Sequence, residues 1–510
     1  MPKSLFFRLD VRIGGLSALW KPIVTTEDMK RFASFCILVV AALSLMAART
    51  PQKGYKLTLI IDGGHDSVMY FGTYFVGKTY SIDTAHVNRK GQFVFEKKNY
   101  DLRPGLYFFT NQQGRYVEVV MYNEDFNITF HTAESDWTGN MKVKGSPQND
   151  LFFTYQRINR SFYNLFNDAK QRMDPQGEEY KAFYREQVRL MDSITLDVIE
   201  KHPESLLGIM LNARRTPSVP TVDANGDSLT FGQQLHHYLL HYFDYVALDN
   251  DAILRTPESI FQKKLTDYLD RNLRNAHPDS IIYYVDAMIA RAEPAKEVYQ
   301  YLVHTITEKY LQSKVMSYDA VYVHMVHTYY TSGKAFWASP ATIESETRRA
   351  DKWAKLLVGK QAPELVLRDR EKRFHSMYSI PSKYTLLVFW SPSCGHCKVE
   401  IPQLFAKFKE YRDKCDITAF TILSEPDEKT REKWYDFIAK HNLNDPHWLN
   451  LDGGEANIDW HDVYDVETTP QIYLLDREKK ILAKKLSASS FDIVIKELEP
   501  QLKSSEEADE

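Results

Sequence analysis

Cysteine is scarce in this chain, and its scarcity limits what the cysteines can do. Only four occur among 510 residues, at positions 36, 394, 397 and 415. Small exported domains that depend on disulfides carry many more cysteines for their size. A closed zinc site needs four ligands, usually from a second Cys-x-x-Cys or a histidine pair. A single Cys-x-x-Cys therefore favours redox chemistry over a disulfide-stapled scaffold or a zinc site.

The chain also lacks an excess of charge of either sign. Its formal net charge is -4, with 26% charged and 44% hydrophobic residues, which is the balance of an ordinary globular protein. That balance gives no reason to expect nucleic acid as a partner. The length predicts roughly three domains of about 150 residues each.

The apolar run near the start, residues 32–46, is short. Two basic residues precede it and two alanines follow it. A basic start, a short apolar middle and small residues at the end are typical of a secretory signal, and the run is too short for a comfortable membrane span. We predict that residues 1–48 are an upstream extension and a signal peptide. The alternative is an uncleaved segment that anchors the protein in a membrane.

Turn signals and hydrophobic periodicity divide the remaining chain into three parts. Short strand-like runs between Gly, Pro, Asn and Asp residues predict an all-β sandwich over residues 50–146. Helical spacing broken by prolines predicts an all-α domain over residues 149–356. Strands that alternate with helices predict an α/β domain over residues 357–502. The acidic tail, residues 503–510, is predicted to be disordered.

The stretch from Trp390 to Lys398 contains the paired cysteines. It follows a continuous apolar run, residues 384–389, of the kind expected for a buried strand, and it precedes a helical pattern. The N-terminal end of a helix carries partial positive charge, which favours a thiolate. We predict that Cys394, at the exposed end, attacks a disulfide and that Cys397, one turn further in, resolves the mixed disulfide.

Residues 390–402, Trp-Ser-Pro-Ser-Cys-Gly-His-Cys-Lys-Val-Glu-Ile-Pro, together with Thr469-Pro470 before a strand, resemble the thioredoxin fold. More narrowly, residues 357–502 are similar to exported thiol–disulfide oxidoreductases of the ResA/TlpA type. The N-terminal half resembles β-sandwich and helical domains of unknown function that precede such domains in Bacteroides-type Gram-negative bacteria. The resemblance implies a periplasmic enzyme whose redox group is a Cys394–Cys397 disulfide, with no other cofactor and no metal.

The resemblance also implies a surface that binds the substrate. Pro470 would be the cis-proline that faces the cysteine pair. It would leave the backbone of Thr469 free to hydrogen-bond an extended substrate segment. Trp390 would belong to the same substrate-binding surface. The implied partners are thiols or disulfides of exported proteins, and an unidentified membrane electron donor.

Three further residues would adjust the chemistry of the pair. Glu400 matches a glutamate of the ResA-type group and would take the proton from Cys397, whereas without the resemblance it reads as an exposed helix residue. Gly395 and His396 would adjust the reduction potential of the cysteine pair. The ResA-type context favours the reducing direction. Cys-Gly-His-Cys, the sequence of disulfide isomerases, favours a potential of about -180 mV rather than the about -270 mV of thioredoxin.

Two other function classes compete with the oxidoreductase. A non-catalytic periplasmic or surface binding protein would hold a partner with its N-terminal domains and use the thioredoxin domain as a scaffold. The presence of both cysteines favours the enzyme. A peroxiredoxin needs Pro-x-x-x-Thr/Ser-x-x-Cys, and Leu387 stands where that proline would be.

Overall fold

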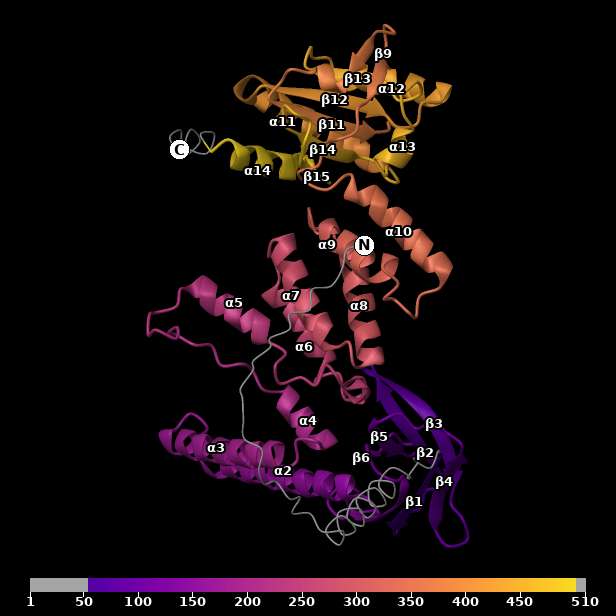
Figure 1. The fold of residues 1–510 in the computed structure, drawn as a ribbon, viewed down its shortest axis with the longest axis vertical. Helices are drawn as coiled ribbons and strands as arrows, with labels where there is room; N and C mark the ends of the chain where they lie inside the picture. Colours follow the sequence, from indigo (N-terminus) through magenta and orange to yellow (C-terminus); the bar gives the residue numbers. More distant parts are fainter. Residues whose placement is uncertain (1–53, 501–510) are drawn as a thin grey trace, which may run out of the picture.

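The computed structural model describes residues 54–500, which form an elongated molecule (Figure 1). β-Sheets lie at one end, an α/β domain lies at the other, and helices lie between them. This arrangement confirms the predicted fold class. The predicted signal peptide and acidic tail fall outside the described residues. Among residues 54–500, no helix has the length and apolar character needed to cross a membrane.

The N-terminal region contains two four-stranded sheets. Their strands are β1 (Gly54–Asp62), β2 (Val68–Phe75), β3 (Lys78–His86), β4 (Gln92–Lys98), β5 (Gly105–Thr110), β6 (Tyr116–Met121), β7 (Asn127–Ala133) and β8 (Lys142–Lys144). One sheet has the order β4-β1-β7-β8 and the other β3-β2-β5-β6. The buried rings of Tyr55 and Phe71, one from each sheet, lie 5.8 Å apart. The two sheets therefore pack face to face as a sandwich.

One strand of this sandwich, β3, was not predicted. Its side chains are mostly exposed and polar, so hydrophobic alternation does not reveal it. Asp83 and His86 lie within this strand. The Asp83 carboxylate accepts a hydrogen bond from the Tyr55 hydroxyl at 2.8 Å, which links the exposed strand to the core.

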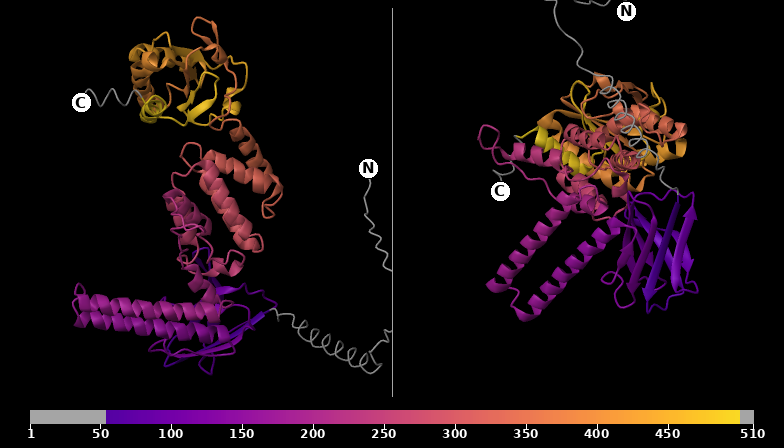
Figure 2. Two further views of the ribbon diagram at one scale, coloured as in Figure 1. Left: turned by 60° about the vertical axis from the view of Figure 1, so that its left-hand side comes forward. Right: turned by 60° about the horizontal axis from the view of Figure 1, so that its bottom comes forward.

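The middle region is helical. Its elements are α2 (Pro147–Arg172), α3 (Glu178–Lys201), α4 (Leu206–Ala213), α5 (Phe231–His241), η1 (Asp251–Arg255), α6 (Gln262–Asp267), η2 (Tyr268–Asn272), α7 (Pro278–Arg291), α8 (Lys296–Leu311), α9 (Asp319–Met325), η3 (Val326–Thr331) and α10 (Pro340–Ala354). Ser146 caps α2 by accepting the N–H of Asn149 at 3.0 Å, and Pro147 occupies the first helical position. Helices α2 and α3 lie side by side and project from the body (Figure 2). One hydrophobic core runs from the sandwich into these helices.

The C-terminal domain is built on a seven-stranded sheet. Its elements are β9 (Val366–Asp369), β10 (Phe374–Ser376), η4 (Met377–Ser379), β11 (Tyr384–Trp390), α11 (Gly395–Cys415), β12 (Ile417–Leu423), α12 (Glu428–His441), β13 (Trp448–Asp452), α13 (Trp460–Val463), β14 (Gln471–Leu475), β15 (Ile481–Lys484) and α14 (Ala488–Leu498). The strand order is β10-β9-β13-β12-β11-β14-β15. Every residue of β11 is buried, and separate hydrophobic cores cover the two faces of the sheet.

The pairing of β11 and β12 places two chain segments at one edge of the sheet. The strands are parallel, and their last residues, Trp390 and Leu423, pair with each other. Parallel strands end at the same edge, where α/β sheets usually carry their sites. The segments that follow the two strands, starting at Ser391 and Ser424, therefore lie together. The cysteine pair belongs to the first of these segments.

Both polar and apolar contacts join the helical region to the C-terminal domain, since Met316 and Leu356 pack against the cores of that domain. Lys484 on β15 and Asp319 on α9 form a buried ion pair, with each side chain only about 5% exposed (6% and 5%). The Lys484 ammonium also donates to the carbonyl of Leu356 at 2.6 Å. On α10, the Trp353 indole N–H donates to the Asp465 carboxylate at 2.6 Å. The sandwich and the helices, by contrast, share one continuous hydrophobic core.

Candidate active site

The two paired cysteines lie at the junction of β11 and α11. Cys394 is the N-cap of α11, and its sulfur accepts the backbone N–H of Cys397 at 3.4 Å. Cys394 is partly exposed, whereas Cys397 is fully buried in the core under α11. Both are free thiols. A helix N-terminus offers unpaired N–H groups, so this is a favourable place for a thiolate at Cys394.

The environments of the two sulfur atoms separate their acidities. Partial burial of Cys394 disfavours its thiolate, but hydrogen bonds from the N–H groups of Cys397 and His396 outweigh burial and hold the pKa of Cys394 below its ordinary value. Burial raises the pKa of Cys397 to about 12. Near neutral pH, Cys394 is therefore the more readily ionised nucleophile, and Cys397 keeps its proton until it acts.

The loop before β14 closes over the cysteine pair. The Cys394 thiol donates to the carbonyl oxygen of Thr469 at 3.1 Å. The peptide bond between Thr469 and Pro470 is cis. Two segments 75 residues apart in sequence thus meet at the sulfur atom that is partly exposed. Of the predicted substrate-binding residues, Thr469 contacts the reactive sulfur directly.

Trp390 lies elsewhere than the resemblance implied. Its indole is fully buried in the core beneath the cysteine loop, and its ring centroid is 5.3 Å from that of Phe437. A side chain with no exposed surface cannot touch a docked polypeptide in this conformation. As the last residue of the buried strand β11, Trp390 supports the site from below instead of contacting the substrate.

The remaining predicted residues surround the pair. Gly395 and His396 are exposed, and no atom lies within 4 Å of the place where a Cβ of Gly395 would stand, so this side of Cys394 is open. Glu400 is partly buried on α11, and its carboxylate accepts the backbone N–H of Ala488, the first residue of α14. The positive N-terminal end of α14 stabilises that carboxylate.

Two residues at the site, Ser391 and Glu425, were not predicted from the sequence. Ser391 is fully buried, and its hydroxyl donates to the Glu425 carboxylate at 2.6 Å. Its hydroxyl oxygen accepts the N–H of Ser393 at 3.1 Å. Its carbonyl accepts the N–H of Cys394 at 3.2 Å. The sequence analysis did not pair the two buried strands with each other. A parallel pairing would have placed Glu425 beside the cysteine loop.

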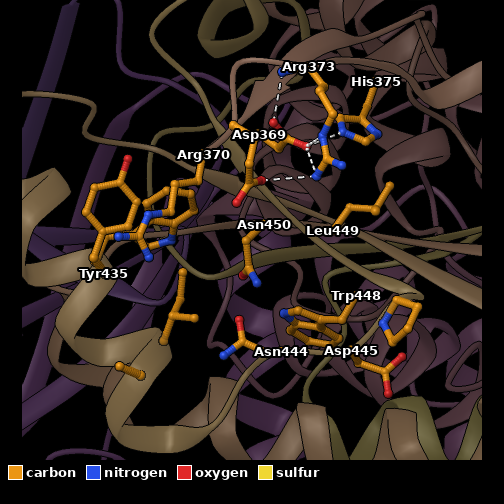
Figure 3. A pocket seen from close by; sticks show the side chains of 15 residues that line it. Asp369, Arg370, Arg373, His375, Tyr435, Asn444, Asp445, Trp448, Leu449 and Asn450 are labelled. Carbon is orange, nitrogen blue, oxygen red and sulfur yellow. Dashed lines mark hydrogen bonds and ion pairs between the residues drawn. The ribbon is translucent and has the colours of Figure 1, made fainter.

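A separate pocket of about 510 Å³ lies between the β9–β10 hairpin, α12 and β13 (Figure 3). The Asp369 carboxylate at its rim accepts hydrogen bonds from Arg373 and His375, and the Arg370 guanidinium lies 4.7 Å from the Tyr435 ring centroid. None of its lining residues belongs to the cysteine loop or to the segment before β14. Among residues 54–500, no cluster of three or more His, Cys, Asp or Glu side chains could hold a metal ion.

Three family models match the chain in succession. Residues 55–152 match DUF4369 and residues 194–340 match DUF5106, both domains of unknown function. Residues 358–484 match the AhpC/TSA family. The order of these matches agrees with the predicted order of two N-terminal domains of unknown function before a thioredoxin-like domain.

Curated relatives match the C-terminal domain. The thioredoxin-like protein YneN of Bacillus subtilis is 29% identical over 120 residues, which are 24% of this chain and 66% of that protein. The thiol-disulfide oxidoreductase ResA of Bacillus cereus is 27% identical over 135 residues, which are 26% of this chain and 72% of that protein. The chain thus spans about two thirds of the length of these relatives. They confirm the predicted resemblance and the predicted enzyme class.

Solved structures from related bacteria are also similar to the chain. A thioredoxin-like protein from Bacteroides caccae is 18% identical, with a TM-score of 0.42, over 55% of this chain and 98% of that one. A domain of a possible thiol-disulfide isomerase from Cytophaga hutchinsonii is 32% identical, with a TM-score of 0.26, over 29% of this chain and 97% of that one.

Proposed function

Because the C-terminal domain of this chain belongs to the thioredoxin-like proteins of the AhpC/TSA family, we propose that the protein is a thiol–disulfide oxidoreductase that acts on exported proteins. Cys394 attacks a client disulfide and forms a mixed disulfide, and the client leaves with one thiolate. Cys397 then attacks Cys394, releases the second client thiolate and leaves a Cys394–Cys397 disulfide. No other cofactor takes part in this proposal.

One observation carries the proposal: the two thiols differ in exposure and acidity while sharing hydrogen bonds. Cys394 is the partly exposed, more acidic thiol, and Cys397 is the buried thiol directly behind it. An attacking thiol needs access and thiolate character, whereas a resolving thiol needs proximity and protection. A scaffold without catalysis would need neither property.

The chain also supports proposals for the neighbouring residues. Pro470 and the backbone of Thr469 form the surface that receives an extended client segment, since Thr469 already contacts the reactive sulfur. Glu400 receives the proton of Cys397, because three residues are almost one helical turn and the two side chains share one end of α11. His396 and Gly395, both exposed beside Cys394, tune the potential of the pair.

We place this activity in the periplasm and in the reducing direction. The location follows from the signal-like residues 29–48, and the direction follows from the ResA-type resemblance. The Cys-Gly-His-Cys sequence leads us to expect a milder reductant than thioredoxin, and the lowered pKa of Cys394 acts in the same direction by stabilising the reduced form as a thiolate. A membrane protein would then have to return two electrons to the pair after each turnover.

Insulin reduction tests the proposal directly. The wild-type chain with dithiothreitol should precipitate the insulin B chain far faster than dithiothreitol alone, and the Cys394→Ser variant should match the reagent alone. Equal rates for wild type and variant would refute the oxidoreductase and favour the non-catalytic binding protein. The Cys397→Ala variant, expressed in cells, should retain clients as mixed disulfides on Cys394 and so identify them.

A further inference from the structure

Ser391 connects the two cysteines to the neighbouring strand. Its carbonyl accepts the N–H of Cys394, and its backbone lies close enough to the Cys397 sulfur to lower the pKa of that thiol, against the larger effect of burial. Its hydroxyl donates to Glu425 at 2.6 Å and accepts the N–H of Ser393 at 3.1 Å. One fully buried residue therefore contacts both halves of the redox pair and is itself held by a carboxylate.

The segment after β12 also fixes the peptide plane that precedes Ser391. The Ser424 N–H donates to the Trp390 carbonyl at 2.9 Å. A trans peptide is planar, so fixing the Trp390 carbonyl also fixes the direction of the Ser391 N–H on the opposite side of the bond. That N–H is the group by which Ser391 favours the Cys397 thiolate. Ser424 and Glu425 thus hold Ser391 through its backbone and its side chain at once.

Glu425 is an exposed residue, yet its carboxylate accepts the hydrogen bond from the buried Ser391 hydroxyl. It follows β12 directly, at the edge of the sheet where β11 ends. A carboxylate at the surface is well solvated and has no need of a buried partner, yet it reaches a serine with no exposed surface. A hydrogen bond to a carboxylate is stronger than one between neutral groups. The pair therefore anchors the loop to the sheet edge.

We propose that Ser391, held by Glu425, is a positioning residue that keeps the two sulfur atoms aligned for the attack of Cys397 on the mixed disulfide. This inference rests on the proposed thiol–disulfide exchange. In that step Cys397 loses its proton to Glu400, the base of the proposed function, and its sulfur forms a bond to the Cys394 sulfur. The bond between Cys394 and the client sulfur breaks, and the client sulfur leaves with the electron pair.

The aromatic disulfide dithiobis-nitrobenzoate separates the two steps in the full-length protein. The attack of Cys394 releases the first thionitrobenzoate, and the attack of Cys397 on the resulting adduct releases the second. We expect Ser391→Ala and Glu425→Ala to slow the second release about tenfold, the size expected when a hydrogen bond to a charged group is loosened. The first release should change less, because the N–H of Cys397 still reaches the Cys394 sulfur.

Matched variants distinguish positioning from charge and from misfolding. Glu425→Gln keeps a hydrogen-bond acceptor without the charge and should restore most of the second rate. Glu432→Ala removes an exposed carboxylate of α12 and controls for a change in net charge. The inference is overturned if Ser391→Ala and Glu425→Ala keep a second rate within twofold of wild type, or if Glu425→Gln is as slow as Glu425→Ala.

The same assay separates failure of this inference from failure of the proposed function. If the wild-type chain releases only one equivalent, Cys397 does not resolve the adduct and the oxidoreductase itself is refuted. Cys415 is buried at the far end of α11, and its slow reaction is measured in a variant that lacks both paired cysteines. Because Glu425 is exposed, its variants should fold even if those of Ser391 do not.

Discussion

The N-terminal body and the C-terminal domain use their polar side chains differently. In the body, histidines pair with single carboxylates: His324 with Asp286 at 2.8 Å and His327 with Asp351 at 2.9 Å. These pairs join neighbouring helices, and none belongs to a metal-binding cluster among the described residues. In the C-terminal domain, polar groups converge on two sulfur atoms. The proposed reaction therefore belongs to the C-terminal domain.

The two regions also differ in how their cores are divided. The sandwich and the helices share one continuous hydrophobic core, whereas the C-terminal domain has its own cores on the two faces of its sheet. Elements that share a hydrophobic core tend to unfold together. Domains with separate cores, joined by a smaller junction, are coupled less strongly. We therefore expect the body and the C-terminal domain to unfold as two units.

The largest expected effect is a loss of insulin reduction, which a substitution in the C-terminal domain should cause and one in the body should not. Cys397→Ala should lower multiple-turnover insulin reduction to the level of dithiothreitol alone, because the mixed disulfide is no longer resolved efficiently. His324→Asn, which breaks a polar pair of the body, should leave the rate within about twofold, because this pair lies outside the C-terminal domain. A comparable loss in both variants would contradict the assignment of the chemistry to the C-terminal domain.

The junction between the regions should show the next largest effect. Lys484→Met leaves the carboxylate of Asp319 buried without its partner, which should destabilise the protein by about 3–5 kcal/mol in urea unfolding. The double variant Lys484→Met with Asp319→Leu removes both charges and should recover most of the loss. If the single variant is no less stable than the double one, the ion pair does not hold the two regions together.

The sequence predicted the reactive cysteines better than it predicted the residues that hold them in place. Cys394 and Cys397 were found because a buried strand, a Cys-x-x-Cys and a helical pattern follow one another within a short stretch. Hydrophobic periodicity predicts the secondary structure of short, continuous stretches such as this one. Trp390 was misplaced because its role was carried over from the resemblance, whereas in this structure it is a buried residue at the end of β11.

The contacts that sequence reasoning missed are all distant in sequence. Ser391 and Glu425 are 34 residues apart, and Glu400 and Ala488 are 88 apart. Predicting them requires strand order and helix packing, which no local pattern contains. The strand β3 was missed for a different reason: its exposed polar side chains lack the alternation by which strands are recognised.

Within the C-terminal domain, Cys394 and Cys397 should differ in how their alkylation depends on pH. Alkylation of Cys394 by iodoacetamide should reach half its maximal rate at a lower pH than alkylation of an ordinary thiol, because its thiolate is favoured. Below that pH the rate should fall tenfold per pH unit. Cys397, with a pKa of about 12, should stay unreactive across the same range in a Cys394→Ser variant.

Peptide mapping by mass spectrometry assigns the alkylated residue at each pH. Cys415, whose pKa burial also raises, is the internal reference for a thiol with no helix N-terminus beside it. A Cys394 rate that keeps rising above pH 9, or one that equals the rate of Cys415, would contradict an activated thiol. The site would then lack the property that distinguishes it from the buried cysteines.

The smallest effect tests whether the two regions unfold separately. Ser205 caps α4 in the body by accepting the Gly208 N–H at 2.9 Å, and Ser487 caps α14 in the C-terminal domain by accepting the Ser490 N–H at 3.1 Å. Each change to alanine should cost about 1 kcal/mol. The smaller unit has the smaller unfolding entropy, so calorimetry should show a shift of about 4 °C for Ser487→Ala and about 2 °C for Ser205→Ala, each in its own transition. Equal shifts of one common transition would mean that the junction couples the regions as tightly as a shared core.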